Sequence, residues 1–390
     1  MRYLSAGESH GPCLTAIIEG LPAGLVIKKE KIDKHLQRRQ GGYGRGGRMK
    51  IEKDSVEFLS GLRFNKTIGS PLTLQIKNRD YKNWQKVMSP EGDPLPEAVA
   101  LVRPRPGHAD LAGGLKYGHD DLRMILERSS ARETAIRVAV GSVGRILLEK
   151  YGVDICSHVK SIGTVKADAG ISDLPGLIEQ VEQSPLNCAD PAAEKEMIRE
   201  IDEARKNGDT LGGVIEIVVT GLPPGLGSHV HFDRKLDGRL CGALASIQGI
   251  KAVEVGAGFL AAAMPGSLFH DPIMVNEEQG VFRSTNRAGG LEGGITNGQP
   301  LILRAAMKPI PTLANPLPSI DWLTGDESRG AAERSDICAV PAAAVVAEAA
   351  IAWELAVAFR EKFAGDFIEE IDAAFEYYIS SVNRRLRKKR

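Results

Sequence analysis

Apolar side chains recur along the chain at two spacings, and each spacing predicts one kind of element. Between residues 130 and 151 they return every three or four positions, at Ile136, Val140, Val143 and Leu147, which is the spacing of a buried helix face. This spacing predicts helices over 30–39, 130–151, 174–183, 191–207, 233–248, 341–363 and 366–382. Shorter apolar runs predict strands over 13–19, 51–58, 72–76, 155–160, 214–220, 252–259 and 301–306.

The order of these elements favours a mixed α+β fold, because helices and strands do not alternate as they do in a doubly wound sheet. One stretch of the pattern occurs twice. Residues 17–39 and 217–240 both run from an apolar strand through a G-L-P-x-G-L turn to a basic amphipathic helix, which opens at Asp33 or Asp233. We therefore expect a single domain over 1–390, built from two related halves near 1–205 and 206–390.

The composition narrows the range of functions. The chain has 390 residues, of which 43% are hydrophobic, with 50 basic and 50 acidic side chains and a net charge of zero. A neutral balance argues against a general nucleic-acid or membrane-surface binder, because such proteins carry a basic excess.

Cysteine usage and the apolar runs indicate a cytoplasmic protein without a membrane segment. The five cysteines are scattered and form no C-x-x-C pair, which favours reduced thiols. The N-terminal stretch MRYLSAGESHG lacks the apolar region of a signal peptide. The late run AVPAAAVVAEAAIAW contains Glu348 and is predicted to be too short to cross a bilayer.

The stretch ERSSARETA (127–135) is predicted to be a helix start. Ser130 and Glu133 have the spacing of a capping box, in which the two side chains bind free amides of the first turn. The neighbouring Arg128, Ser129 and Arg132 supply more polar groups than a helix cap needs. Because a helix N-terminus attracts anions, an ordinary cap and an anion site both fit this stretch taken alone.

A glycine-rich loop, RRQGGYGRGGR (38–48), holds four arginines and no acid. Arg39, Arg45 and Arg48 could close over a phosphorylated small molecule, since guanidinium groups bind phosphate through paired hydrogen bonds. The same composition could bind RNA.

Two histidines lie in stiff or glycine-flanked turns. His108 stands in RPRPGHAD (103–110), a segment predicted to be too stiff for a helix, and His10 stands in GESHG (7–11). A histidine in such a turn is usually structural or solvated. Near a phosphate and an arginine, His108 could instead donate a proton to a leaving group near neutral pH.

Asp336 precedes the long late helix, where an acid commonly complements the helix dipole. Another pair, His229 and His231, could lie on one face of a strand. We expect no metal site there, because no nearby carboxylate or cysteine completes a ligand set.

Five segments in order, AGESHGP, RPRPGHADL, ERSSARETAIRVAVG, GGLEGGITNGQP and RSDICAVPAAA, resemble the chorismate synthase family over residues 1 to about 360. The resemblance implies a β-α-β sandwich with helices packed between two antiparallel sheets, assembled as a homotetramer. It implies a carbon–oxygen lyase of aromatic amino-acid biosynthesis, acting at the last step of the shikimate pathway. Such an enzyme converts 5-enolpyruvylshikimate 3-phosphate to chorismate and phosphate by a 1,4-elimination that requires reduced FMN.

The resemblance also implies binding residues. The matched FMN-binding positions are Arg128, Ser129, Ser130, Gln248, Gly249, Gly293, Lys308, Pro309, Ile310, Pro311, Thr312 and Arg334. The matched positions for the anionic groups of the substrate are Arg39, Arg45, Arg48, Arg105 and Arg132. The first two can also belong to an NADP site, so NADPH stays open as the source of reducing equivalents.

The resemblance implies separate catalytic roles for three residues. His10 would protonate or polarise the flavin near its N1–C2=O edge, and His108 would protonate the departing phosphate. Asp336 would help flavin N5 accept the ring proton.

Two other classes of function remain as alternatives, an RNA-binding protein that uses 38–48 and the basic C-terminal tail, and a metal-dependent phosphatase. Salt-dependent RNA binding or chelator-sensitive phosphate release would identify them.

Overall fold

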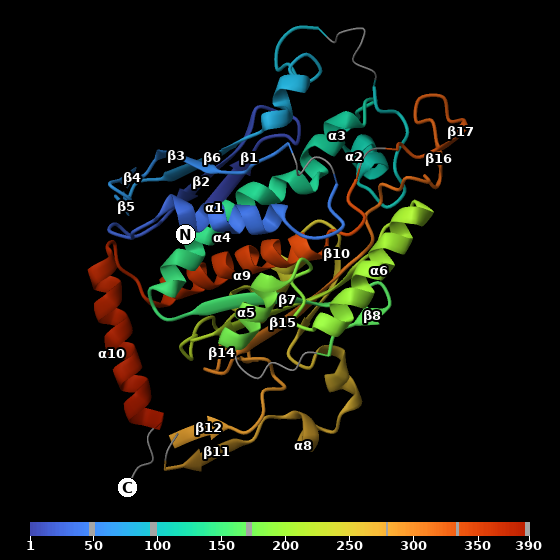
Figure 1. The fold of residues 1–390 in the computed structure, drawn as a ribbon. Coiled ribbons are helices and arrows are strands. Elements are labelled where there is room, and N and C mark those ends of the chain that lie inside the picture. The colour runs from blue at the N-terminus through green and yellow to red at the C-terminus, as the bar shows by residue number, and fades with distance from the viewer. Residues whose placement is uncertain (47–50, 94–99, 169–173, 278–279, 333–334, 387–390) are drawn as a thin grey trace.

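The computed structural model describes residues 1–46, 51–93, 100–168, 174–277, 280–332 and 335–386. Two antiparallel sheets lie on opposite sides of a layer of helices (Figure 1). The first sheet has the order β1-β2-β6-β3, with β1 Arg2–Ala6, β2 Cys13–Glu19, β6 Leu72–Lys77 and β3 Val56–Ser60. The second has the order β10-β15-β9-β7-β8, with β10 Ile250–Val255, β15 Leu301–Met307, β9 Gly213–Thr220, β7 Asp154–Ile162 and β8 Val165–Lys166.

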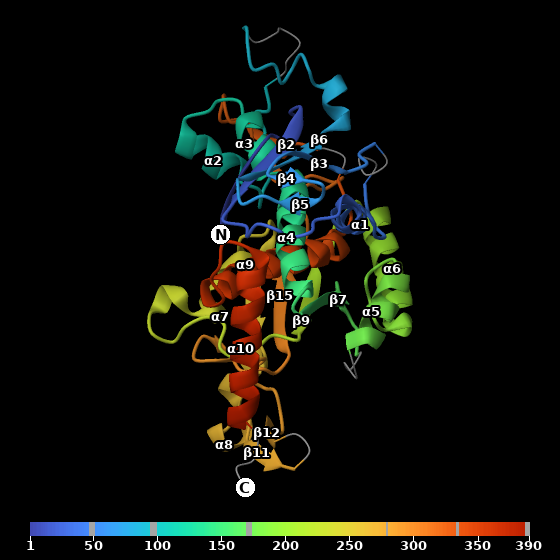
Figure 2. The same cartoon turned by 90° about the vertical axis from the view of Figure 1, so that its left-hand side faces the viewer.

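Helices α1 (Lys29–Gln40), α4 (Thr134–Glu149) and α9 (Val340–Lys362) form the middle layer. Helix α4 packs on β2 and β6 of the first sheet, and α9 packs on β7 and β9 of the second. Figure 2 keeps the same order, with the first sheet above α4 and α9 and with β9 and β15 below. The predicted α+β fold, with helices between antiparallel sheets, is confirmed.

The close approach of α4 to α9 explains the small residues in both helices. A Cβ atom added at Gly141 would lie 2.2 Å from the carbonyl oxygen of Ala349, so the two backbones meet where no side chain fits. The apolar run within α9 was expected to be too short for a membrane span, and this is wrong for the helix as a whole. Helix α9 is long and apolar enough to cross a bilayer, but most of it is buried inside the protein.

Glu348 is the buried carboxylate of α9, and two arginines surround it. Arg38 binds it through two hydrogen bonds of 2.7 and 2.9 Å, and Arg145 Nη1 lies 2.9 Å from its Oε2. Burial raises the pKa of Glu348, but the two guanidinium groups lower it more, to about 2. A charge in the core is tolerated when it is paired in this way.

The remaining elements lie around these three layers. The helices are α2 Asp110–Tyr117, α3 Arg123–Ser129, α5 Leu174–Gln183, α6 Pro191–Asn207, α7 Leu236–Ala245, α8 Gly266–Phe269 and α10 Ile368–Leu386. The hairpins are β4 Leu62–Arg63 with β5 Lys66–Thr67, β11 Ile273–Asn276 with β12 Gly280–Arg283, β13 Leu291–Glu292 with β14 Ile295–Thr296, and β16 Pro318–Ile320 with β17 Glu327–Arg329.

Several boundaries differ from the prediction. The helix predicted over 130–151 is a 3₁₀ turn at Ala131–Glu133 followed by α4, and the helix predicted over 233–248 is shortened to α7. The strand predicted over 51–58 begins only at Val56. The segment predicted to be too stiff for a helix leads directly into α2, which begins at Asp110.

The two G-L-P-x-G-L turns make the same contacts. Thr67 Oγ1 accepts a hydrogen bond from Leu25 N at 2.9 Å and donates one to Pro22 O at 2.6 Å. Thr296 makes the equivalent pair with the last leucine and the first proline of the second turn, at 2.8 and 2.7 Å. Each threonine comes from a short hairpin, β4–β5 or β13–β14. These matching turns support the hypothesis of two related halves.

Candidate active site

The segment ERSSARE ends α3 and begins the 3₁₀ turn that leads directly into α4. Ser129 ends α3 and donates from Oγ to a carbonyl oxygen of its own helix at 2.8 Å. Ser130 Oγ accepts a hydrogen bond from Arg132 N at 3.3 Å. Glu133 accepts a hydrogen bond from Gln248 Nε2 at 3.0 Å and does not reach back to Ser130. Ser130 therefore caps the turn as predicted, but the reciprocal bond from Glu133 is wrong, because Glu133 binds a residue from the second half of the chain.

The turn that precedes β2 packs against this junction. Arg128 donates to the carbonyl oxygens of Ser5 and Gly7, at 3.1 and 3.0 Å. Ser9, which is buried, donates from Oγ to Ser130 Oγ at 3.1 Å. The motifs AGESHGP and ERSSARE therefore form one continuous surface.

His10 is held in this surface by a carboxylate that the sequence did not single out. Its Nδ1 lies 2.8 Å from Glu127 Oε1, and its backbone N–H donates to Glu127 Oε2 at 2.7 Å. Burial raises the pKa of Glu127, but the bonds from His10 and the charge of Arg123 hold it below its ordinary value. The ring of Trp84 lies against the imidazole, with centroids 4.1 Å apart.

Two of the predicted substrate arginines meet on a buried aspartate. Arg132 Nη1 donates to both oxygens of Asp54, at 2.7 and 2.8 Å, and Arg132 Nε donates to Asn78 Oδ1 at 2.9 Å. Arg39 Nε donates to Thr134 Oγ1 at 2.9 Å, and Arg39 Nη1 lies 3.5 Å from Asp54 Oδ2. The shared carboxylate holds the two guanidinium groups beside each other.

This pair of arginines keeps unused donors in a buried place. Among the described residues, neither Arg39 Nη1 nor Arg132 Nη2 has a hydrogen-bond partner, and both are shielded from solvent. Burial lowers the pKa of Arg39, Asp54 raises it, and the guanidinium of Arg132 lowers it again. Each nitrogen lies near a carboxylate, Arg39 Nη1 at 3.5 Å from Asp54 and Arg132 Nη2 at 3.8 Å from Glu52. Buried donors that make no hydrogen bond on two neighbouring cations favour a further anion at this point.

The glycine-rich loop contacts the segment that leads into α9. Arg45 Nη1 lies 2.9 Å from Asp336 Oδ2, and the N–H of Gly46 donates to Asp336 Oδ1 at 2.5 Å. Both carboxylate oxygens of Asp336 therefore bind the glycine-rich loop. Arg48 and Arg334, the other predicted residues of these two segments, lie outside the described residues.

Arg105 and His108 share one carboxylate. Arg105 Nε lies 2.9 Å from Asp110 Oδ2, and His108 Nδ1 lies 2.5 Å from Asp110 Oδ1. Burial raises the pKa of Asp110, but these two partners hold it well below its ordinary value. Arg105 Nη1 also donates to Thr312 Oγ1 at 3.1 Å. Arg105 therefore links RPRPGHAD to the loop over Lys308–Thr312.

The loop over Lys308–Thr312 joins this group to the Gln248–Gly249 pair. The Lys308 ammonium donates to Gly107 O, and the backbone N–H of Lys308 donates to Gly249 O at 2.9 Å. Burial and the nearby Lys251 lower the pKa of Lys308. The remaining residues of this loop are Pro309, Ile310, Pro311 and Thr312.

Gly293 lies apart from the other predicted FMN-binding residues that the structure describes. It occupies the turn of the β13–β14 hairpin with a φ of +60°, and a Cβ built there would lie 3.9 Å from His229 Cβ. Figure 1 draws β14 on the other side of the helical layer from α3. The fold of one chain therefore does not bring Gly293 to Ser129 and Ser130.

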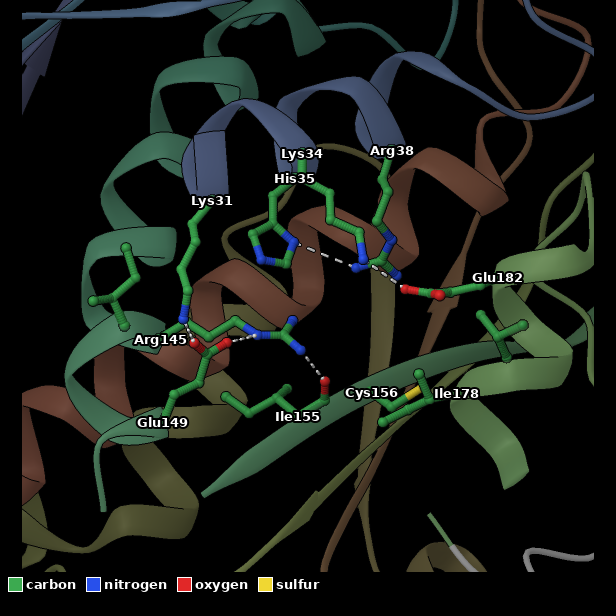
Figure 3. Close-up of a pocket in the computed structure, with 12 residues that line it drawn as sticks. Lys31, Lys34, His35, Arg38, Arg145, Glu149, Ile155, Cys156, Ile178 and Glu182 are labelled. Atoms are coloured by element: carbon green, nitrogen blue, oxygen red, sulfur yellow. Dashed lines mark hydrogen bonds and ion pairs between the residues drawn. The ribbon is translucent and has the colours of Figure 1, made fainter. Parts of the chain in front are cut away.

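A separate cavity of about 210 Å³ lies between α1, α4, α5 and β7 (Figure 3). Lys31 and Arg145 are paired there with Glu149, and Lys34 is paired with Glu182. None of the predicted site residues lines this cavity. Its balanced charges are typical of a structural ion-pair network.

Sequence reasoning missed the acids and the aromatic residue that hold the predicted site. Glu127 and Asp110 stood inside quoted motifs, but their pairing with histidines depends on the fold. Asp54 and Trp84 come from segments without any motif signal. A buried arginine needs a counter-charge, but the sequence does not say which acid supplies it.

Comparison with known proteins agrees with this geometry. The family model described as chorismate synthase matches residues 1–359. The chain is 58% identical to the chorismate synthase of Desulforamulus reducens over 374 residues, covering 96% of this chain and 97% of the relative. It is 56% identical to that of Symbiobacterium thermophilum over 392 residues, covering 99% and 100%. A crystal structure of chorismate synthase matches with a TM-score of 0.79 and 44% identity, covering 98% of each chain. The chain belongs to the chorismate synthase family.

Proposed function

We propose that the protein is a carbon–oxygen lyase that converts 5-enolpyruvylshikimate 3-phosphate to chorismate and phosphate with reduced FMN. Family membership over most of the chain supports this activity, which is the final step of the shikimate pathway. We also propose that the protein acts in the cytoplasm, because its scattered cysteines favour reduced thiols.

The observation that supports the proposal most is the pair of buried guanidinium nitrogens, Arg39 Nη1 and Arg132 Nη2, that lack hydrogen-bond partners among the described residues. Both nitrogens face carboxylates, at 3.5 Å from Asp54 and 3.8 Å from Glu52, but a buried donor without a hydrogen bond costs free energy that a bound anion would offset. A substrate with one phosphate and two carboxylates supplies groups of the right charge and geometry.

The residues at the α3–α4 junction also fit FMN. Ser129 and Ser130 offer hydroxyl groups, Lys308 offers a cation, and Gln248 Oε1 is buried without a hydrogen-bond partner among the described residues. Together these groups can bind a phosphate and the polar edge of a flavin ring. Reduced FMN, when bound, supplies electron density as the C–O bond breaks and recovers it as the proton is lost, so no net redox change results.

Phosphate departure is assigned to His108 and the arginines. In this proposal His108 donates a proton to the leaving oxygen, while Asp110 holds the ring through Nδ1 at 2.5 Å. Arg39 and Arg132 stabilise the negative charge that grows on the phosphate, because their orientation is already fixed by Asp54.

The other half of the elimination is assigned to Asp336 and His10. Asp336 is bonded to the glycine-rich loop through Arg45 and Gly46, and it would help flavin N5 to accept the ring proton. Arg45, which pairs with Asp336 in this structure, must turn toward the substrate to bind it. His10 donates a hydrogen bond to the polar edge of the flavin.

The proposed assembly is a homotetramer, and exposed apolar surface supports self-association. Leu4 of β1 and Ile17 of β2 are cross-strand neighbours, and both are exposed. Ile273 and Val275, on the β11–β12 hairpin, are exposed as well. Apolar patches of this kind commonly mark protein–protein contacts.

An anaerobic assay tests the proposed function. The protein is incubated with 5-enolpyruvylshikimate 3-phosphate and chemically reduced FMN, and the absorbance of chorismate is followed. Chorismate should form with reduced FMN and should not form with oxidised FMN alone. Formation at full rate after removal of flavin would contradict the proposal. A chelator should leave the rate unchanged, since no cluster of three or more histidine, cysteine or acidic side chains suited to a metal occurs in the described ranges.

A further inference from the structure

Glu127 makes two hydrogen bonds to the same histidine, one to each of its oxygens. Oε2 accepts from the backbone N–H of His10 at 2.7 Å, and Oε1 lies 2.8 Å from His10 Nδ1. The carboxylate is almost fully buried, with 3% of its side chain exposed. Two bonds to one residue fix both the backbone and the ring of His10, so its imidazole cannot rotate without breaking a buried contact.

Arg123 and Trp84 also pack against this pair, and neither side chain is an acid. Arg123 Nη1 lies 3.6 Å from Glu127 Oε1, farther than His10 does, and the guanidinium of Arg123 stacks on Trp84 at 5.0 Å. Trp84 packs on the imidazole and donates from Nε1 to Asp80. Glu127 is thus the carboxylate in direct contact with His10.

We propose that Glu127 is the positioning residue for His10. It accepts the proton on Nδ1, which directs Nε2 away from the carboxylate, and its negative charge stabilises the protonated ring. This inference rests on the proposed function only for the role of His10 in turnover. The arrangement itself is a property of the free protein.

The same chain contains a comparable pair at the second predicted catalytic histidine. His108 Nδ1 contacts Asp110 at 2.5 Å. A carboxylate on one ring nitrogen is a common way to select the tautomer of a histidine and to orient the other nitrogen. Both predicted catalytic histidines are therefore held through Nδ1 by a buried acid.

Three variants separate charge from packing. Glu127→Gln keeps the shape and removes the charge, whereas Glu127→Asp keeps the charge on a shorter side chain. Glu216→Gln is the matched control, because Glu216 is a buried carboxylate that lies 2.9 Å from His158 Nε2 in the second sheet. Circular dichroism and FMN affinity establish that each variant is folded.

The first measurement uses the free protein, without substrate or flavin. Histidine is labelled with ¹⁵N, and the ring signals of His10 are assigned by their absence in His10→Ala. At a pH where the ring is neutral, the parent should carry its proton on Nδ1. Glutamine has one acceptor oxygen in place of two, so in Glu127→Gln the amide donates to Nδ1 and the proton moves to Nε2. A ring spectrum identical to that of the parent would overturn the proposal.

The second measurement is the pH–rate profile of chorismate formation. Glu127→Gln should lower turnover by at least about 10-fold, and by less than the roughly 10²–10⁴-fold loss expected when the acid itself is absent. Its alkaline fall in rate should move to lower pH, because the ring loses its counter-charge. Glu127→Asp should restore the profile, and Glu216→Gln should not move it. If Glu127→Asp behaves like Glu127→Gln, only packing matters and the positioning role is wrong. If the parent protein makes no chorismate but His10 carries its proton on Nδ1, the proposed function is wrong and the role of Glu127 in holding His10 is confirmed.

Discussion

Arg45 Nη1 lies 2.9 Å from Asp336 Oδ2, which joins a residue predicted to hold the substrate to one predicted to move its proton. The N–H of Gly46 adds a second bond to the same carboxylate. In this structure the glycine-rich loop is thus tied to the segment that leads into α9. In the proposed reaction Arg45 binds an anionic group of the substrate and Asp336 helps to move the ring proton, so we expect substrate binding to loosen this ion pair.

Arg45→Ala should weaken substrate binding more than FMN binding. A charge-assisted hydrogen bond contributes about 1.5–3 kcal/mol, so the dissociation constant for substrate should rise by roughly 10- to 100-fold. The measurement is calorimetric titration of substrate and of FMN into each protein. Arg199→Ala is the control, because Arg199 is an exposed arginine that pairs with Glu196 on the same helix. Equal substrate affinity in Arg45→Ala and the parent would show that the loop is not part of the site.

Asp336→Asn should abolish most turnover while folding and FMN binding persist. The substitution keeps the shape of the side chain and removes the charge that accepts a proton. Asp336 is not the N-cap of α9, which is Ala339, so the helix should not lose its cap. Thermal unfolding and rate measurements on the same preparation separate the two effects. A variant that unfolds would indicate that Asp336 serves the helix and the loop, and not the reaction.

His10→Ala and His108→Ala should each lower turnover by roughly 10²–10⁴, with different signatures. Loss of His108 should mainly slow phosphate departure, because that ring lies beside Arg105 and Asp110. Loss of His10 should also change the absorbance of bound reduced FMN when substrate is present. If His10→Ala leaves both that spectrum and the rate unchanged, its assigned role is wrong.

Glu348→Gln should destabilise the fold without changing the chemistry of the site. The substitution leaves the guanidinium groups of Arg38 and Arg145 in the core without their counter-charge, and breaking such a pair costs about 3–5 kcal/mol. Chemical denaturation at neutral pH measures this loss. An unfolding free energy within experimental error of that of the parent would mean that the ion pairs of Glu348 do not stabilise the fold.

The depressed pKa of Glu348 also predicts a pH dependence. Its pKa is lowered from 4.5 to about 2 in the folded protein, so ionised Glu348 favours the folded state above the unfolded value. That contribution should be lost as pH falls from about 4.5 toward about 2, where the folded carboxylate takes up its proton. The difference in unfolding free energy between the parent and Glu348→Gln should therefore shrink over this window.

The long periodic elements could be predicted from the sequence, and the short ones could not. The apolar spacing of 341–363 identified α9 because nearly all of its faces are buried. Strand β1 was missed because its apolar Leu4 points outward and gives no buried alternation. Helix α2 was missed because two prolines precede it and Gly113 and Gly114 lie within it, and glycine has low helix propensity.

The residue types of the site could be predicted, but their pairing could not. Motif resemblance identified Arg39, Arg132 and His10 by position. Whether Arg132 binds a ligand or a carboxylate depends on where the chain places Asp54, which is set by packing of distant segments. Glu133 is the clearest example. Its spacing from Ser130 predicted a hydrogen bond to that residue, whereas in the fold its side chain accepts one from Gln248.

In the proposed reaction the protein eliminates phosphate without net oxidation or reduction. The most direct test is to measure phosphate, chorismate and flavin redox state together, in an anaerobic mixture of protein, 5-enolpyruvylshikimate 3-phosphate and reduced FMN. We expect equal amounts of phosphate and chorismate, over many turnovers, with the flavin still reduced at the end. Phosphate released without chorismate, or flavin oxidised in proportion to product, would contradict the account.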